Sequence, residues 1–414
     1  MGIGGFHNFK EKTLEEVAQQ YLTELMNRSL VQVSKVNYRG KPKECHIHDL
    51  LRDMTLRKME DLRFGSMLIF SSDFLNVTDL CETTFCAKFK LLKEVESHQI
   101  SRLRKLRYLF VFGGETGQTG GLKLVNRFGC LALQNLYNVQ ISDEIEELKK
   151  LTQLRKLGIS CLQTTHEWSV VCDCINEMKH LQSLLVYGLG IVDLDSFSSP
   201  PEFLQSLLLE IPLRMLPKWI PKLQNLAKFE IRLSRLEDNV PLEVLQNLPN
   251  LVVLIMASFA YVGEKLLFKH RMFQKLKHLQ LELMSDLNSL VIGKGALPTL
   301  ERLIISRCYN LTEVPRGIQR LRKLKKLTLP IWFKDSEKPA EGEEDYHIAL
   351  GCRQLIPLLS QAASCVDSQV LDIKCELTNK PFNVSLQAEA DESDTSRDVV
   401  WCGVKSCVEQ VRGV

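Results

Sequence analysis

Several residue groups in this chain have side chains that could support catalysis or bind a metal, but each lacks the partners such chemistry needs. The nine histidines are scattered over 414 residues. No His-Glu-x-x-His segment places two of them on one helix face to bind zinc, and no Gly-x-Ser-x-Gly nucleophile turn occurs. The adjacent carboxylates Glu146–Glu147 and Glu343–Glu344 lie in polar segments, where we expect water to surround them. The sequence therefore favours a binding protein over an enzyme.

Two glycine-rich segments, at residues 1–6 and 113–121, were considered as phosphate-binding loops. Such a loop binds phosphate through its backbone amides in the pattern Gly-x4-Gly-Lys-Ser/Thr. Both segments lack the Lys-Ser/Thr that completes the pattern. We therefore expect no nucleotide or other cofactor to be held by this chain alone.

Composition and charge fit an ordinary globular protein, with 45% apolar and 25% charged residues. The formal net charge of +3 gives no reason to expect a nucleic-acid partner. No stretch approaches the roughly 18 apolar residues that a membrane helix needs. The thirteen cysteines are irregularly spaced without a Cys-x-x-Cys pair. We interpret them as reduced thiols of a cytoplasmic protein, free or peripheral at the plasma membrane, without a metal site.

A leucine pattern of the form Leu-x-x-Leu-x-x-Leu-x-Leu recurs from about residue 100. Clear copies are LRKLRYLFV (103–111) and LTQLRKLGI (151–159). About ten copies begin 21 to 27 residues apart, at positions 103, 130, 151, 178, 201, 223, 248, 273, 297 and 321. This period is typical of leucine-rich repeats.

The last apolar positions of each copy alternate, which predicts a short strand with one buried face. One such strand cannot bury that face alone, so stacked copies are expected to form a parallel sheet that lines a concave surface. Prolines in LPKWIPKL (216–223) and VPRGIQRL (314–321) predict short helical turns on the convex side. The predicted fold class is α/β, a leucine-rich-repeat solenoid with a small α+β segment in front.

Side chains at the variable strand positions project from the concave face and are candidates for partner contact. The candidates are Arg107, Tyr108, Lys228, Arg232, Lys277, His278, Lys325 and Lys326. All of them except Tyr108 are basic. Two interpretations stay open, a solvated rim and a surface that docks an acidic partner.

The seventh repeat differs, because Val252, Val253 and Ile255 occupy positions where polar residues are expected. A contiguous apolar patch on a concave face indicates an interaction site. Phe259 and Tyr261 just beyond it are candidate anchors. Coverage of this patch by another segment of the chain is the alternative.

The segment before the repeats has a different pattern, which predicts helices and strands rather than repeat strands. TLEEVAQQYLTELMNRSL (13–30) opens with the Thr13–Glu16 capping-box spacing and places an apolar stripe on one helix face. A strand, a polar turn, a second strand and a second helix (49–61) are predicted to follow. This order is typical of the end of a winged-helix domain. The segment lacks a dense basic cluster, which disfavours DNA binding.

The two parts together resemble a known family. TLEEVAQQYLTELMNRSLVQV followed by CHIHDLLRDM resembles the winged-helix end of plant nucleotide-binding leucine-rich-repeat immune receptors, the coiled-coil class of the RPM type. LPKWIPKLQNLAKFEIRLSRLEDNVPLEVLQNLPNL and GALPTLERLIISRCYNLTEVPRGI resemble that family's repeats. The resemblance covers roughly residues 13–348.

That resemblance implies a nucleotide-sensing role for two residues. The family's Met-His-Asp motif corresponds to Ile47, His48 and Asp49. It implies that His48 reaches the phosphates of ADP in a full-length receptor, which exchanges ADP and ATP, while Asp49 orients the segment. The alternative is a His–Asp pair that caps the second helix.

We predict four segments: 1–62, a partial winged-helix domain; 63–100, a connector; 101–335, the repeats; and 336–414, a C-terminal cap and a disordered tail. A helix is expected near 351–365 and disorder near 388–398.

The resemblance implies a fragment of a plant innate immune receptor. Its repeats would bind a pathogen effector or a guarded host protein and would also clamp the receptor's nucleotide-binding module. A truncated decoy or adaptor, and a substrate-recognition subunit of a ubiquitin ligase, are the alternatives.

Overall fold

The computed structural model describes residues 14–36, 42–47, 67–71, 86–90, 106–112, 122–124, 132–197, 199–213, 215–237, 240–311, 314–330, 372–376, 381–382, 388–389 and 400–401. The chain forms two compact units, Met1–Ser66 and Met67–Val414.

The first unit contains one helix and a hairpin. Helix α1 (Leu14–Asn27) is followed by β1 (Val31–Val36) and β2 (Pro42–Ile47), which pair antiparallel from Val31 opposite Ile47. The predicted order of helix, strand, turn and strand is confirmed, although β2 begins within the predicted turn. The expected second helix at 49–61 lies outside the described residues.

The apolar stripe of α1 is less covered than its pattern predicts. Tyr21 is 56% exposed and Leu25 is 40% exposed, while Leu22 is half-buried. The helix therefore does not bury its apolar face against the described part of its own unit.

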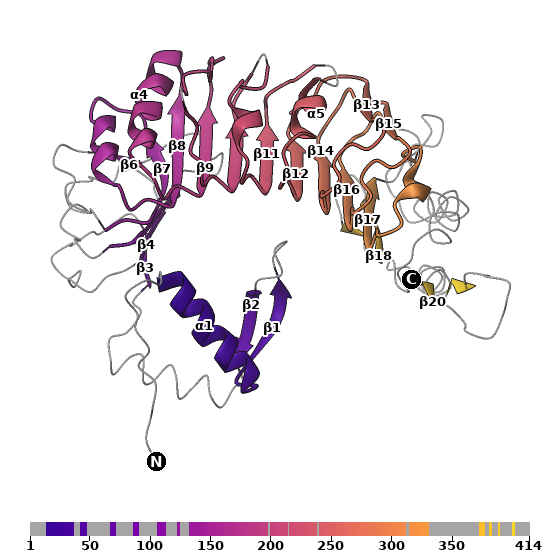
Figure 1. Cartoon of the computed structure of the whole chain (residues 1–414), viewed down its shortest axis with the longest axis horizontal. Coiled ribbons are helices and arrows are strands. Elements are labelled where there is room, and N and C mark those ends of the chain that lie inside the picture. The colour runs from indigo at the N-terminus through magenta and orange to yellow at the C-terminus, as the bar shows by residue number, and fades with distance from the viewer. Residues whose placement is uncertain are drawn as a thin grey trace. The chain divides into compact units, whose positions relative to one another are not determined.

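The second unit is built on one sheet of fifteen strands, which lines the inner side of its curve (Figure 1). Its strands are β3 (Met67–Ser71), β4 (Cys86–Lys90), β5 (Tyr108–Phe112), β6 (Leu122–Lys123), β7 (Asn135–Gln140), β8 (Lys156–Leu162), β9 (Ser183–Gly188), β10 (Ser206–Glu210), β11 (Lys228–Arg232), β12 (Val253–Ala257), β14 (His278–Glu282), β16 (Arg302–Ser306), β17 (Lys326–Pro330), β18 (Asp372–Glu376) and β19 (Pro381–Phe382). Neighbours from β3 to β18 pair in parallel, and β19 closes the sheet antiparallel to β18.

Each of the ten predicted copies supplies one strand of this sheet, from β5 to β17. Every strand begins five residues after the predicted start of its copy, as at 223 and Lys228 or 297 and Arg302. The repeat period is therefore confirmed across the degenerate copies at 130 and 201 as well.

The sheet extends beyond the predicted repeats at both ends. The segment 63–100, predicted as a connector, contains β3 and β4, which continue the parallel ladder. The segment 336–414, predicted as a cap and tail, contributes β18 in the same register, Lys326 opposite Asp372. It also contains a small hairpin, β20 (Ala388–Glu389) with β21 (Val400–Trp401). The helix expected at 351–365, and the expected disorder apart from β20, lie outside the described residues.

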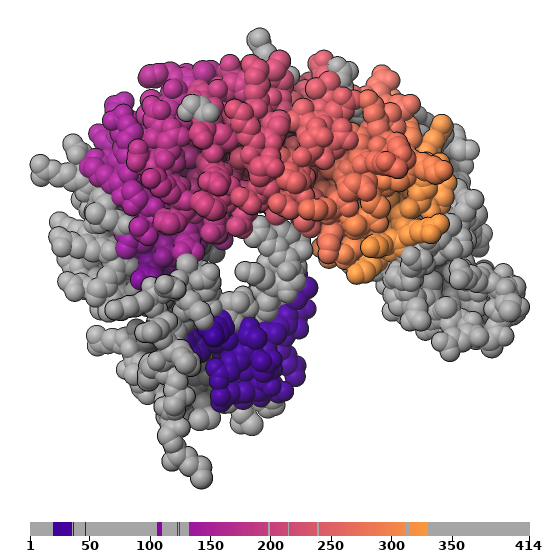
Figure 2. Space-filling model, viewed as in Figure 1, coloured from indigo at the N-terminus to yellow at the C-terminus, as the bar shows by residue number. Residues whose placement is uncertain are grey.

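A ladder of apolar side chains runs behind the sheet, at the second and fourth position of each strand from β8 to β17. Leu207, Phe229, Leu254 and Leu279 are each fully buried. Parallel in-register pairing stacks each of them on its counterpart one repeat away. Figure 2 shows the described repeats from β7 to β17 as one continuous packed body.

The convex side carries short helices and a second small sheet. These are the helical turns η2 (Ile145–Lys150), η3 (Ile220–Lys222) and η4 (Ile318–Arg320), the helices α4 (Thr165–Asn176) and α5 (Val240–Leu245), and the paired strands β13 (Lys265–Phe268) and β15 (Ser289–Ile292). The two turns predicted from proline are confirmed, with Ile220 and Ile318 buried. The second sheet was not predicted.

Helix α4 packs through an aromatic cluster. The ring of Phe197 stands edge-on to Trp168 and to Trp219, with centroids 5.3 and 5.0 Å apart. Both indole N–H groups donate to the buried carbonyl of Leu194, at 2.9 and 2.7 Å. One acceptor therefore joins α4 to the next repeat.

No helix in the described ranges is both long and apolar enough to cross a membrane. Four cysteines with described side chains, Cys161, Cys172, Cys174 and Cys308, are free thiols. Burial raises the pKa of Cys174 and of Cys308 to about 11, which keeps both protonated, as expected for structural rather than reactive thiols.

The shared acceptor predicts non-additive losses of stability. In Trp168→Phe or Trp219→Phe the Leu194 carbonyl keeps one donor, whereas the double variant leaves it with neither indole. A buried unpaired carbonyl costs about 1–3 kcal/mol, so the double variant should lose that much more unfolding free energy than the two single variants together. Urea denaturation of the four proteins measures this difference. Losses that add within about 0.5 kcal/mol would contradict the shared-acceptor role.

Candidate interaction surface on the parallel sheet

In strands β9 to β16 the inner face of the sheet is formed by the first, third and fifth residue, and β17 adds its first and third. Between β9 and β17 these residues form three rows across the sheet, because the strands pair in register. The first row is Ser183, Ser206, Lys228, Val253, His278, Arg302 and Lys326. The third row is Leu185, Leu208, Glu230, Ile255, Gln280, Ile304 and Thr328. The fifth row, from β9 to β16, is Tyr187, Glu210, Arg232, Ala257, Glu282 and Ser306.

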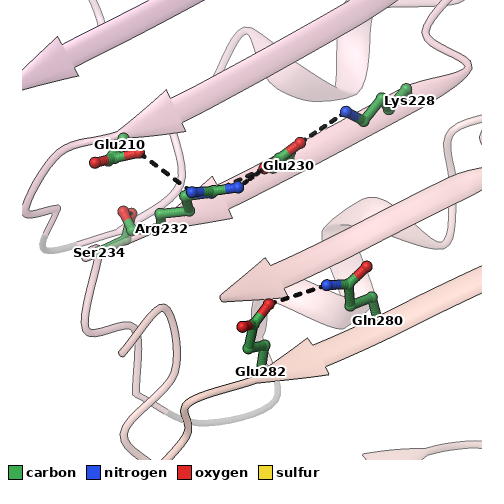
Figure 3. A network of polar contacts seen from close by, with 7 residues as sticks. All are labelled: Glu210, Lys228, Glu230, Arg232, Ser234, Gln280 and Glu282. Atoms are coloured by element: carbon green, nitrogen blue, oxygen red, sulfur yellow. Dashed lines mark hydrogen bonds and ion pairs between the residues drawn. The ribbon is translucent and has the colours of Figure 1, made fainter. Parts of the chain in front are cut away.

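The centre of this face carries an ion-pair network on β10 and β11 (Figure 3). The Glu230 carboxylate, only 6% exposed, accepts from Lys228 Nζ at 2.7 Å and from Arg232 Nε at 2.8 Å. Arg232 Nη1 also lies 3.7 Å from a carboxylate oxygen of Glu210. Two cations and two carboxylates thus balance one another.

The pKa values of the two carboxylates follow from this arrangement. Burial alone would raise the pKa of Glu230, but the hydrogen bond and charge of Lys228, together with Arg232, outweigh it, so the pKa is lowered. Burial raises the pKa of Glu210 because Arg232 compensates less fully there and Glu230 is nearby. Glu230 is therefore the anion on which the network depends.

These pairs revise the expectation of a broadly basic face. Lys228 and Arg232 are on the inner face as predicted, but their charges are neutralised within the chain. Lys277 and Lys325 lie just before β14 and β17, and both pair with Glu301, at 3.3 and 3.1 Å. His278 and Lys326 are the first residues of their strands, where the prediction placed them.

The predicted apolar patch is not contiguous. Val253 is in the first row but only 2% exposed, and Val252 precedes the strand and is half-buried. Ile255 is half-buried in the third row, and Glu230 separates it from Leu208 on β10. The patch prediction is therefore wrong in extent, because neighbouring side chains cover Val253 and a carboxylate interrupts the row.

The two predicted aromatic anchors differ in exposure. Phe259 is 38% exposed and remains a candidate contact. Tyr261 is 2% exposed, and its hydroxyl donates to the Lys265 carbonyl at 2.8 Å. Tyr261 therefore has a structural role rather than an anchoring one.

The remaining candidates lie at the front of the sheet or outside the described residues. Arg107 and Tyr108, at the start of β5, are both half-buried, and the Arg107 carbonyl accepts from the backbone of the next repeat. His48 and Asp49 are not among the described residues.

Sequence reasoning gave no weight to Tyr187, Ile304 and Glu282 on the same face. Tyr187 and Ile304 are half-buried, and the Glu282 carboxylate accepts from Gln280 at 3.0 Å. The repeat pattern contained the signal, because each stands two or four residues after the first position of its strand.

Comparison with known proteins agrees with both parts of the chain. A family model described as "Leucine-rich repeat region" matches residues 73–348. A second, described as "Disease resistance protein Winged helix domain", matches residues 3–55.

Curated relatives are named as disease-resistance proteins. The chain is 27% identical to "Disease resistance protein RPM1" of Arabidopsis thaliana, over 76% of this chain and 44% of that protein. It is 24% identical to "Disease resistance protein RPP13" of the same plant, over 72% of this chain and 43% of that protein. The chain thus spans less than half the length of these relatives. The solved leucine-rich repeat domain of APL1B covers 70% of this chain, and the alignment covers 87% of that domain, at 15% identity and a TM-score of 0.40.

Removal of the central carboxylate should destabilise the sheet. Glu230→Gln leaves Lys228 and Arg232 facing one another without their shared anion, at a cost of about 1–3 kcal/mol of unfolding free energy. The matched control is Glu243→Gln, which breaks the exposed Lys269–Glu243 pair and should cost less than about 1 kcal/mol. Because the pKa of Glu230 is lowered, its contribution is present above the carboxyl's ordinary pKa and is lost as pH falls through the lowered value. Equal losses in the two variants at neutral pH would contradict a central role for Glu230.

His278 should make the fold acid-sensitive. Burial, then the charges of Arg302, Lys228 and Lys326, lower the pKa of His278 from 6.5 to about 4. The unfolded chain therefore binds the proton first, and stability falls as pH drops from 6.5 towards 4. His278→Gln should lose less stability than the unaltered protein when denaturation at about pH 7 is compared with about pH 5. His180→Gln, at an exposed position, should behave like the unaltered protein. An identical loss in the His278 variant would show that this imidazole does not titrate as described.

Proposed function

This chain belongs to the leucine-rich repeat region family, and from that membership we propose that it is the recognition part of a plant disease-resistance receptor. The observation that carries the proposal is the in-register inner face of the sheet. Its variable positions differ from strand to strand, while the ladder behind them stays apolar. The match of residues 3–55 to the disease-resistance winged helix supports defence rather than another use of leucine-rich repeats.

The partner of such a face is a protein. Half-buried apolar residues, Ile255 and Ile304, alternate in the third row with the polar Gln280. Interfaces of moderate affinity combine apolar contacts with a polar surround in this manner. We propose a pathogen effector or a guarded host protein as that partner, recognised without any chemical reaction.

We further propose that the same repeats restrain the nucleotide-binding module of a whole receptor, with His48 and Asp49 at its nucleotide. The resemblance of Ile47-His48-Asp49 to the family's motif supports this role. ADP or ATP would then bind to the whole receptor, and this chain would supply only one side of the contact.

A complementation experiment tests the recognition role. A plant line from which the gene is deleted should lose resistance to at least one pathogen strain and regain it with the unaltered gene. The double variant Ile255→Lys/Ile304→Lys, which places two charges on the inner face, should fold but fail to restore resistance.

The matched control is Leu267→Lys/Val291→Lys, at half-buried positions of the convex strands β13 and β15. It should restore resistance, because it introduces the same residues away from the inner face. If the deletion line resists every strain of a broad panel as well as the unaltered plant does, the proposed role in defence is wrong. Restoration by both double variants would instead remove the inner face as the recognition surface.

A further inference from the structure

Three neighbouring positions of the first row carry basic side chains. His278, Arg302 and Lys326 begin β14, β16 and β17 and lie directly opposite one another in the parallel register. Adjacent strands lie about 4.8 Å apart, so the side chains of Arg302 and Lys326 can reach one anionic group or two neighbouring ones. The first row therefore has a positive segment on its C-terminal half.

This segment differs from the other cations of the inner face in its pairing. Lys228 is paired with Glu230, and Lys277 with Glu301. Among the side chains that the structure describes, Arg302 and Lys326 have neither an ion pair nor a hydrogen bond. Asp372 of β18 follows Lys326 at the same register position. Arg302 and Lys326 are therefore the cations of the first row that no described carboxylate pairs with.

The pKa of His278 reflects the positive charge around it. After burial, the charges of Arg302, Lys228 and Lys326 hold its pKa at about 4, so the ring is neutral near pH 7. Its Nε2 atom is buried without a hydrogen-bond partner. A buried polar atom left unpaired costs about 1–3 kcal/mol. The position is thus unfavourable for a cation, and Nε2 has no hydrogen-bond partner within the chain.

We propose that His278, Arg302 and Lys326 form a docking site for the carboxylates of an acidic segment of the protein partner. This proposal rests on the recognition role proposed above and specifies the partner's chemistry. Arg302 can hold a carboxylate with two parallel N–H donors. Lys326 and His278 flank it, and Ile304 in the next row offers apolar contact to the aliphatic part of a glutamate side chain.

The surroundings favour a protein over a nucleic acid as the source of the anions. Single-stranded nucleic acids bind through basic grooves combined with aromatic side chains on which bases stack. The third-row neighbours here are Gln280, Ile304 and Thr328, none of them aromatic. The three basic residues span adjacent strands rather than a long track for many phosphates.

Fluorescence anisotropy with the full chain tests the site. The probe is a labelled short peptide of alternating glutamate and serine at low ionic strength, where charge pairing is least screened. Arg302→Gln should weaken binding roughly tenfold or more, the usual scale for a charge-assisted hydrogen bond. Lys277→Gln removes the same charge nearby, yet leaves Glu301 paired with Lys325, and should change binding by less than about threefold.

Three outcomes would overturn the proposal: no peptide binding by the unaltered chain, equal weakening in both variants, or tighter binding of a single-stranded oligonucleotide of equal length. Arg302→Gln should leave the thermal midpoint unchanged, because no described side chain pairs with Arg302, so weaker binding would not reflect unfolding.

NMR of histidine-labelled protein provides a readout that unfolding does not mimic. A bound carboxylate offsets the charges of Arg302, Lys228 and Lys326, so the midpoint for His278 should move upward from about 4 when the peptide is added. The Arg302→Gln chain should lack this peptide-dependent shift. If the peptide does not change the titration midpoint of His278, its carboxylates bind somewhere other than beside Arg302.

The two proposals fail separately. If the peptide does not bind, but Ile255→Lys/Ile304→Lys still abolishes resistance, the recognition role stands and the acidic partner is wrong. If resistance is unaffected by every inner-face variant while the peptide binds at Arg302, the site is real but does not serve recognition.

Discussion

The structure depends on one constraint, which is that a single repeat strand cannot bury its own apolar face. Each strand contributes two inward residues to the ladder, and those residues are covered only when the next strand stacks in the same register. The hydrogen bonds between neighbouring strands therefore form only where the apolar ladder also stacks, and the ladder is buried only where those hydrogen bonds set the register. This constraint explains why the parallel pairing continues through degenerate copies, such as the one at 130, and why β3, β4 and β18 extend it at both ends. The same constraint leaves every second residue free of any role in the core.

The alternate strand positions that face away from the ladder form the inner face. Their charged side chains pair with whichever charges the fold brings close, including charges on neighbouring repeats. Glu230 neutralises cations two residues before and after it, because alternation places all three on one side of the strand. Glu301 pairs with two lysines that are 24 residues away on either side, because the register brings them beside it. What the surface offers to a partner is the charge that remains after these pairs form. On the first row of the inner face, this remaining charge lies at Arg302 and Lys326.

The link from this surface to plant defence rests on two different kinds of observation. The repeats and the winged-helix match identify the family, and family membership by itself names no partner. Under the two proposals above, a partner would make apolar contact near Ile255 and Ile304 and carry negative charge near Arg302. This chain spans less than half the length of these relatives.

The sequence alone determined the fold class, the position of all ten predicted strands and the residues of the apolar ladder, because burial at a fixed period is a local, repeated signal. It also identified Lys228, Arg232, Lys277, Lys325 and Val253 as inner-face or rim residues. Only the tertiary structure decided which of them are available to a partner. Glu230 and Glu210 balance Lys228 and Arg232, Glu301 pairs with both Lys277 and Lys325, and packing covers Val253. The second sheet of β13 and β15, the ends of the parallel ladder and the shared Leu194 acceptor were likewise not predictable. Each depends on residues from neighbouring repeats meeting in space, and neither periodicity nor composition records which side chains become neighbours.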